Sequence, residues 1–242
     1  AVGSDPAALL CAKGDVVFDW CAPRALEVVD MGSKGRGVRA TRDIHPPELL
    51  IVQRPRSACS ENFVGDRGFT MSTDNRRRIV DTGSQTKLKA YLTSAACSDA
   101  LLASTLVSLS DGSRPTPPAV PIDALLDTLS PKVLPLLGQH PDFFPPSERL
   151  EVSSARVAGV VDVNCHGGAC EKGGSTSTNL YPAISLLNHA KSPNCAILPV
   201  VRGGTAVAVV VGANRHIRAG EEVTVSYSED EAVVERKWGP IL

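Results

Sequence analysis

Short apolar runs separated by turn residues characterise both ends of the chain, whereas its middle has the spacing of helices. Near the N-terminus, such runs around a glycine-rich turn at 32–37 predict β-elements at 16–18, 25–29, 38–44 and 49–52. Alanine and leucine then recur at intervals of three and four residues from Lys87 to Leu109, which predicts one or two helices. Further helices are predicted over 122–137, where prolines interrupt the pattern, and from Pro146 to about Val161.

Strand patterns return in the last third of the chain. Runs rich in β-branched residues predict strands over 197–201, 206–211 and 223–227. The pair Gly203-Gly204 between the first two runs fits a two-residue hairpin turn. Because β-elements from both ends must meet in space around the helical middle, we predict one α+β domain with an insertion rather than two autonomous domains.

Composition narrows the classes of protein that need consideration. The chain is 43% hydrophobic and 21% charged, as is typical of soluble globular proteins. The net charge of −1 provides no overall field to hold nucleic acid, so we expect no direct nucleic-acid binding. Seven cysteines at irregular spacings, with no C-x-x-C pair, indicate reduced thiols and a cytoplasmic or nuclear location. No apolar run is long enough to predict a membrane span.

Two motifs near the C-terminal end are the strongest candidates for chemistry. Residues 187–194 read L-N-H-x-x-x-P-N, and residues 220–227 read G-E-E-x-x-x-x-Y. Together they resemble the SET-domain lysine methyltransferases, and the words at 180–189, Leu-Tyr-Pro-x-Ile-Ser-Leu-Leu-Asn-His, are most similar to the MYND-associated (SMYD-like) branch. The glycine run at 32–44 is similar to the opening motif of the same family.

The resemblance implies a fold and a division of the chain. SET domains have small curved β-sheets built from both ends of the sequence around a helical insertion, with a knot-like crossing near the C-terminus. On that basis we expect an N-terminal part of the SET domain at 1–56, a helical insert at 57–157, a C-terminal part carrying the motifs at 158–230, and a tail at 231–242.

The resemblance also implies a reaction, the transfer of methyl groups from S-adenosylmethionine to lysine side chains of a protein. A histone tail is one candidate substrate, and we expect a monomer. Tyr227, whose hydroxyl would point at the methyl-transfer channel, is the implied catalytic residue. The implied cofactor contacts are Lys34, Gly35, Arg36, Asn164, Asn188, His189 and Tyr227.

Each of these features also has a plainer interpretation. The run at 35–40 fits the loose dinucleotide pattern G-x-G-x-x-A, but Pro46-Pro47 follow too soon for the helix that pattern needs. Asn188-His189 alone resembles a loop cap, and Tyr227 alone resembles a packed strand tyrosine. Cys165, His166 and Cys170, with Cys195, match no standard zinc spacing, so we expect no metal.

The sequence also departs from the family pattern. Ala190-Lys191 stand where Ser-Cys usually follows the histidine, residues 45–90 lack the cysteines of a MYND module, and no cysteine follows Tyr227. Trp238 is the only large aromatic residue left to close the cofactor site. The alternative function is therefore a weak or inactive SET module that serves as a protein-interaction domain.

Overall fold

The structure is a computed structural model that describes residues 20–60, 69–71, 80–112, 152–169, 176–202 and 205–228, together with Ala232, Val234 and Glu235. The early strands are β1 (Trp20–Cys21), β2 (Leu26–Asp30), β3 (Arg36–Ala40), β4 (Leu49–Gln53), β5 (Ser57–Ser60), β6 (Phe69–Met71) and β7 (Val80–Thr82). The late strands are β8 (Cys165–Ala169), β9 (Thr176–Leu180), β10 (Asn188–His189), β11 (Cys195–Arg202), β12 (Thr205–Ala213) and β13 (Glu222–Val225). The helices are α2 (Gly83–Ala96), α3 (Ala100–Ser108) and α6 (Ser154–Asn164), with 3-10 turns η2 (Gly32–Lys34) and η3 (Ile184–Leu186).

Strands from the two ends of the chain pair with each other in several small sheets. One sheet has the order β1-β4-β12-β11, a second β10-β13-β3-β2, and a third β5-β9-β8. In each of them an early strand is bonded to a late one: β4 to β12, β3 to β13, and β5 to β9, all antiparallel. An isolated bridge between Ile44 and Ile217 joins the loops that follow β3 and β12. The prediction that the first and last thirds of the chain meet is confirmed.

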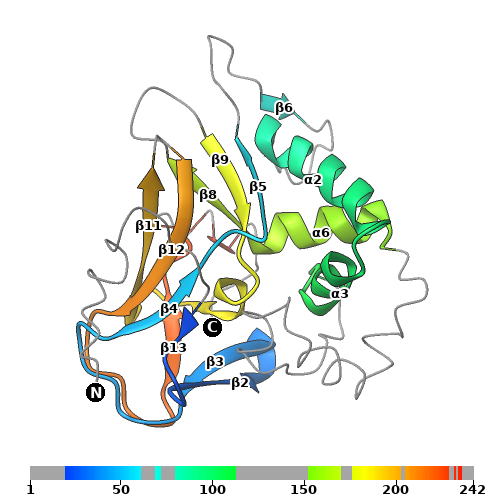
Figure 1. The fold of residues 1–242 in the computed structure, drawn as a ribbon. Coiled ribbons are helices and arrows are strands. Elements are labelled where there is room, and N and C mark those ends of the chain that lie inside the picture. Colours follow the sequence, from blue (N-terminus) through cyan, green and yellow to red (C-terminus); the bar gives the residue numbers. More distant parts are fainter. Residues whose placement is uncertain are drawn as a thin grey trace.

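The helices gather on one side of the sheets, at the right of the view in Figure 1. The predicted helical stretch from Lys87 to Leu109 is confirmed as two helices, α2 and α3. Their apolar residues, including Leu92 and Leu106, pack against Val160 of α6 in a buried cluster of their own. No helix among the described residues is long and apolar enough to cross a membrane.

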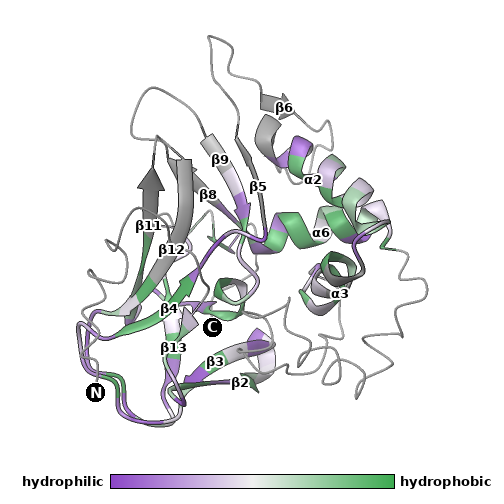
Figure 2. Ribbon diagram, viewed as in Figure 1, coloured by the Kyte–Doolittle hydropathy of each residue, from purple (hydrophilic) through white to green (hydrophobic). Residues whose placement is uncertain are grey.

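A second apolar cluster lies between the sheets and holds the candidate site in place. It contains Val38 of β3, Ile51 of β4, Leu187 before β10, and Val223 and Val225 of β13, all fully buried. Figure 2 shows hydrophobic elements in both apolar clusters, with β4 and much of α6 coloured green. Burial of these side chains fixes the register of β13, because a slip of one residue would turn its valines out of the core.

Two segments contain strands that were not predicted. Gly167 and Gly168, expected in a flexible loop, lie in β8 and pair with Thr178 and Ser177 of β9. Residues 57–157, expected to be helical, include the short strands β5, β6 and β7. β5 has no apolar alternation and β6 and β7 have only three residues each, so these strands form because a neighbouring strand supplies their hydrogen bonds.

The helix predicted from Pro146 begins instead at Ser154, within the residues that the structure describes. Ser153 is the N-cap, with an extended backbone at φ −64° and ψ 150°, and its Oγ accepts a hydrogen bond from the backbone N of Arg156 at 3.1 Å. A serine side chain that satisfies a free N–H of the first turn is a strong helix start. The helix continues to Asn164, so the expected boundary at 157 falls inside α6.

Strand ends near the motifs also shift. β3 starts at Arg36, inside the predicted glycine turn, because Arg36 pairs with Asp30 of β2. β13 ends at Val225, which leaves Tyr227 in the following loop. The elements predicted at 16–18 and 122–137, the Gly203-Gly204 turn and Trp238 lie outside the described residues.

Candidate functional site

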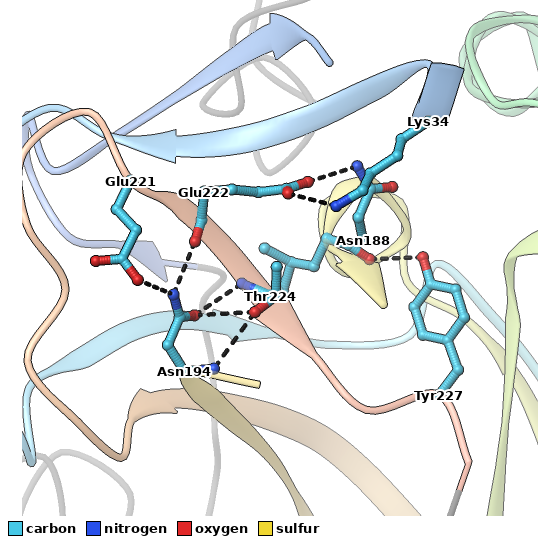
Figure 3. A network of polar contacts seen from close by, with 8 residues as sticks. Lys34, Asn188, Asn194, Glu221, Glu222, Thr224 and Tyr227 are labelled. Atoms are coloured by element: carbon cyan, nitrogen blue, oxygen red, sulfur yellow. Dashed lines mark hydrogen bonds and ion pairs between the residues drawn. The ribbon is translucent and has the colours of Figure 1, made fainter. Parts of the chain in front are cut away.

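The motifs noted in the sequence converge where β10, β13 and β3 lie side by side. Asn188 and His189 form β10, which pairs in parallel with β13 so that Asn188 stands opposite Thr224. On its other edge β13 pairs with β3, with Val223 opposite Val38. This order brings the glycine-rich turn, the Asn-His pair and the Gly-Glu-Glu motif into one neighbourhood (Figure 3).

A shared carboxylate, that of Glu222, links two of the predicted cofactor contacts. Its Oε2 accepts a hydrogen bond from Lys34 Nζ at 2.8 Å, and its Oε1 accepts one from Asn188 Nδ2 at 2.8 Å. The side chains of Lys34 and Glu222 are 35% and 20% exposed, so this polar cluster is open to solvent on one side. Ligands can therefore reach it, and its charges are only partly screened.

Sequence reasoning did not include Glu222 among the site residues. The available signal was its place at the start of a predicted strand within the Gly-Glu-Glu motif. The motif alone does not say which glutamate faces Asn188. Figure 3 shows the side chains of Glu221 and Glu222 directed to opposite sides, and the register of β13 decides between them.

Two glycines in the first motif are required by geometry. Gly35 has φ +74°, in the left-handed region that favours glycine, where the chain leaves η2. Gly37 is needed for space, since a Cβ there would lie 2.6 Å from Asn188 Nδ2, 2.7 Å from Met31 Cγ and 3.1 Å from Glu222 Oε1. The glycines thus let β3 approach the side chains of Asn188 and Glu222 closely.

Replacement of Gly37 by alanine is expected to lower the free energy of unfolding by about 1 to 2 kcal/mol, the usual cost of an overfilled site. The new methyl group would displace the Asn188 side chain from Glu222. Denaturant unfolding measures the effect. Gly212→Ala is the matched control, because its Cβ would meet only the Glu48 carbonyl oxygen at 3.8 Å. A Gly37→Ala protein as stable as the control would contradict the close packing seen here.

Asn194 of the Pro-Asn pair has a structural role. It is 1% exposed, and its Nδ2 donates to the backbone oxygen of Glu222 at 2.7 Å. Its Oδ1 accepts from the backbone N of Thr224 at 2.8 Å. A buried asparagine satisfied in this way ties the loop before β11 to β13.

His189 supports Tyr227. The Nδ1 of His189 accepts a hydrogen bond from the backbone N of Tyr227 at 3.1 Å, and the two rings lie 5.4 Å apart at 45°. Because Nδ1 is an acceptor here, a neutral ring carries its proton on Nε2. His189 is thereby brought next to the predicted catalytic residue, and its cofactor contact stays a prediction.

The hydroxyl of Tyr227 is held at a defined point. It donates to the backbone oxygen of Leu187 at 2.7 Å, one residue before Asn188 (Figure 3). Burial, and then the nearby charge of Glu222, hold the pKa of Tyr227 well above its usual range. A neutral phenol that donates its O–H hydrogen bond to a carbonyl can still accept a hydrogen bond from a further group through its oxygen lone pairs. It is suited to orienting a substrate and unsuited to removing a proton.

Two predicted cofactor contacts, Arg36 and Asn164, turn their side chains to the C-terminal end of α3. Arg36 Nη2 donates to the Ser108 oxygen at 2.6 Å, and Asn164 Nδ2 donates to the Ser110 oxygen at 2.5 Å. Burial, with a smaller contribution from the charge of Arg156, lowers the pKa of Arg36 to about 10. These donors satisfy carbonyls that a helix end leaves without partners. The structure therefore does not bring Arg36 and Asn164 to the Glu222 cluster by their side chains.

Arg156 also caps the C-terminal end of α3. Its Nη2 donates to the oxygens of Val107 at 2.9 Å and Leu109 at 2.5 Å, and its Nη1 pairs with Asp111 Oδ2 at 2.6 Å. Cationic donors are favoured at the negative end of a helix dipole. The contact of Arg36 joins the end of α3 to β3, and that of Asn164 joins it to the C-terminal end of α6.

The cysteines and histidines of the described residues form no group of three or more potential metal ligands. Cys195, one of the ligands considered from the sequence, is buried, and burial raises the pKa of its thiol to about 12 despite the opposing charge of Arg215. Cys170, another candidate, lies outside the described residues.

Comparison with known proteins identifies the family. The model of the SET domain family matches residues 35–228, a span that includes β3, the Asn-His pair, Glu222 and Tyr227. A search of curated proteins finds no match.

Among solved structures, the chain is similar to a SET domain of LSMT bound to lysine and AdoHcy, with 14% identity and a TM-score of 0.42. It is also similar to Rubisco LSMT bound to sinefungin and monomethyllysine, with 12% identity and a TM-score of 0.41, and to Rubisco LSMT bound to AdoMet, with 14% identity and a TM-score of 0.39. These matches cover 91–93% of this chain but only 53–54% of the other chains, so the chain spans about half the length of those proteins. Such low identities and TM-scores carry no argument about substrate or activity. Because the family model covers most of its length, the chain belongs to the SET-domain family.

Proposed function

We propose that this protein transfers methyl groups from S-adenosylmethionine to lysine side chains of a protein substrate. The observation that carries the proposal is the polar cluster of Lys34, Asn188 and Glu222 beside Tyr227, in a chain that belongs to the SET-domain family.

The residues of the cluster fit the proposed cofactor. S-adenosylmethionine carries a carboxylate, an ammonium group and an adenine amino group. Lys34 supplies a cation for the carboxylate. Asn188 donates from Nδ2 to Glu222, and its Oδ1 can accept a hydrogen bond from an ammonium or amino group. When bound, the cofactor supplies an electrophilic methyl group on a sulfonium.

The residues around Tyr227 suit the substrate amine. A lysine has a pKa near 10.4 in water, so only about one in a few thousand is neutral and nucleophilic at pH 7. Burial of the lysine lowers its pKa and raises that fraction. Tyr227, neutral and anchored on Leu187, orients the amine through its oxygen rather than by taking a proton. Positioning of this kind lowers the barrier of a transfer reaction, because the two reacting groups are already held together.

We also propose a subfamily, a topology and a location for this protein. The words at 180–189 support a place in the SMYD-like branch. The parallel pairing of β10 with β13 supports a knot-like crossing near the C-terminus, and the helices between the two halves support a helical insertion at 57–157. We also propose a cytoplasmic or nuclear monomer that acts on proteins such as histones and binds neither membrane nor nucleic acid.

Two measurements on the same protein test the function. A ligand at about one hundred times its dissociation constant adds about 2.7 kcal/mol to stability, so S-adenosylmethionine should raise the melting temperature clearly. Labelled cofactor should then transfer its methyl group to a lysine in a panel of histones and cell lysates. Binding without transfer would support the inactive interaction module, and the absence of both would contradict the proposal.

A further inference from the structure

The carboxylate of Glu222 is shared between two residues that we assign to the cofactor site. We propose that Glu222 is a positioning residue, which orients the Asn188 amide and the Lys34 ammonium so that they recognise the cofactor. The inference deepens the proposed function and rests on it. It assigns to Glu222 a role in affinity, exerted through Asn188 and Lys34 rather than by contact with the reacting atoms.

The surroundings of Glu222 show that its side chain is built into the site. Its backbone oxygen is bound by Asn194 Nδ2 at 2.7 Å, which holds the start of β13. Its side chain is 20% exposed and crosses to β10 and to η2, as Figure 3 shows. The missing Cβ of Gly37 leaves the space in which Glu222 Oε1 and Asn188 Nδ2 meet. A surface glutamate that only solvates the strand would need neither contact.

The chemistry of the amide explains what the carboxylate does. An asparagine side chain has a donor end and an acceptor end of nearly the same shape, and rotation by half a turn exchanges them. An ionised carboxylate only accepts hydrogen bonds, so it holds Nδ2 of Asn188 toward itself. Oδ1 is then the end available to a ligand, and it selects a ligand that carries a donor. Glu222 thereby decides which kind of group Asn188 recognises.

The ion pair with Lys34 acts in the same direction. Lys34 lies 188 residues before Glu222 and reaches it at 2.8 Å from η2. The ammonium of a lysine has three donors on a flexible stem, so one bond to Glu222 restrains it and leaves two donors for an anionic ligand group. Restraint of both side chains before binding reduces the entropy lost when the cofactor arrives.

Glu222→Gln tests the inference with little change in shape. Lys34 Nζ and Asn188 Nδ2 donate to different oxygens of Glu222, and the glutamine replaces one of these oxygens by an NH2 donor, so one of the two hydrogen bonds is lost in place. We expect the dissociation constant for S-adenosylmethionine, measured by calorimetry, to rise roughly tenfold. Glu221→Gln is the matched control. Glu221 pairs with Arg215 at 2.7 Å on the opposite side, and its substitution should leave cofactor affinity unchanged.

A double-mutant cycle with Asn188→Ala separates positioning from a general structural role. If Glu222 acts through Asn188, the double variant Glu222→Gln, Asn188→Ala should bind the cofactor only slightly more weakly than Asn188→Ala alone. The remaining difference would be the contribution that Glu222 makes through Lys34. A purely structural role would make the two losses add and would lower the melting temperature without ligand. Additive losses, or unchanged affinity in Glu222→Gln, would overturn the inference. Unchanged affinity in Asn188→Ala would instead remove the site of the proposed function.

Discussion

Replacement of Tyr227 by phenylalanine is expected to lower the turnover number of methyl transfer by roughly tenfold or more while the affinity for cofactor changes little. The substitution keeps the ring that lies against His189 and removes only the hydroxyl. That hydroxyl is anchored on the Leu187 oxygen at 2.7 Å and remains neutral, so its proposed contribution is to orient the amine in the transfer step. Steady-state turnover with a methylated product as readout measures the effect.

The same change has a small cost in stability, which the experiment has to separate from the loss of turnover. The Leu187 carbonyl loses one hydrogen bond, worth about 1 kcal/mol, so the melting temperature should fall only slightly. Tyr91→Phe is the control, because Tyr91 is 57% exposed on α2, away from β13. Equal turnover of Tyr227→Phe and the control would make Tyr227 a packing residue.

The second large effect is expected from Asn188→Ala, which should weaken S-adenosylmethionine binding by about 1 to 3 kcal/mol. The alanine removes the acceptor that we assign to the cofactor and leaves Glu222 Oε1 without the amide that it holds. Calorimetric titration of the variant measures the loss. The backbone pairing of β10 with β13 does not involve the amide, so the fold should be retained.

Asn214→Ala controls for the loss of an asparagine side chain. Asn214 is exposed in the loop after β12 and contributes its backbone N, rather than its side chain, to the bond with the Asn194 oxygen. Its substitution should leave cofactor binding unchanged. Cofactor affinity in Asn188→Ala equal to that of this control would remove the central residue of the proposed site.

Local patterns were sufficient for much of the fold. The intervals of leucine and alanine from Lys87 to Leu109 predicted α2 and α3, and the valine runs predicted β11, β12 and the region of β13. These signals succeed because helical and strand periodicity are properties of neighbouring residues. The same patterns missed β5 and β8, whose sequences, Ser-Ala-Cys-Ser and Cys-His-Gly-Gly-Ala, have no strand periodicity.

Within the candidate site, the motifs predicted which residues to examine but not what each side chain contacts. Lys34, Asn188, His189 and Tyr227 come together as the motifs indicated. Arg36 and Asn164, predicted for the same site, donate their side-chain hydrogen bonds to carbonyls at the end of α3, and their cofactor contacts stay predictions. No local pattern marks that helix end as a partner, because it lies 72 residues from Arg36 and 54 from Asn164.

The sequence by itself therefore determined the β, helical, β order, the two motifs and the residue types available for chemistry, all of which depend on short-range spacing. Only the tertiary structure decided that Glu222 rather than Glu221 holds Asn188, that Gly37 must lack a side chain, and that β5 and β8 are strands. The physical reason is that hydrogen-bond partners and free space are supplied by distant segments. Lys34 and Glu222, 188 residues apart, meet only because β3 and β13 are neighbours in one sheet.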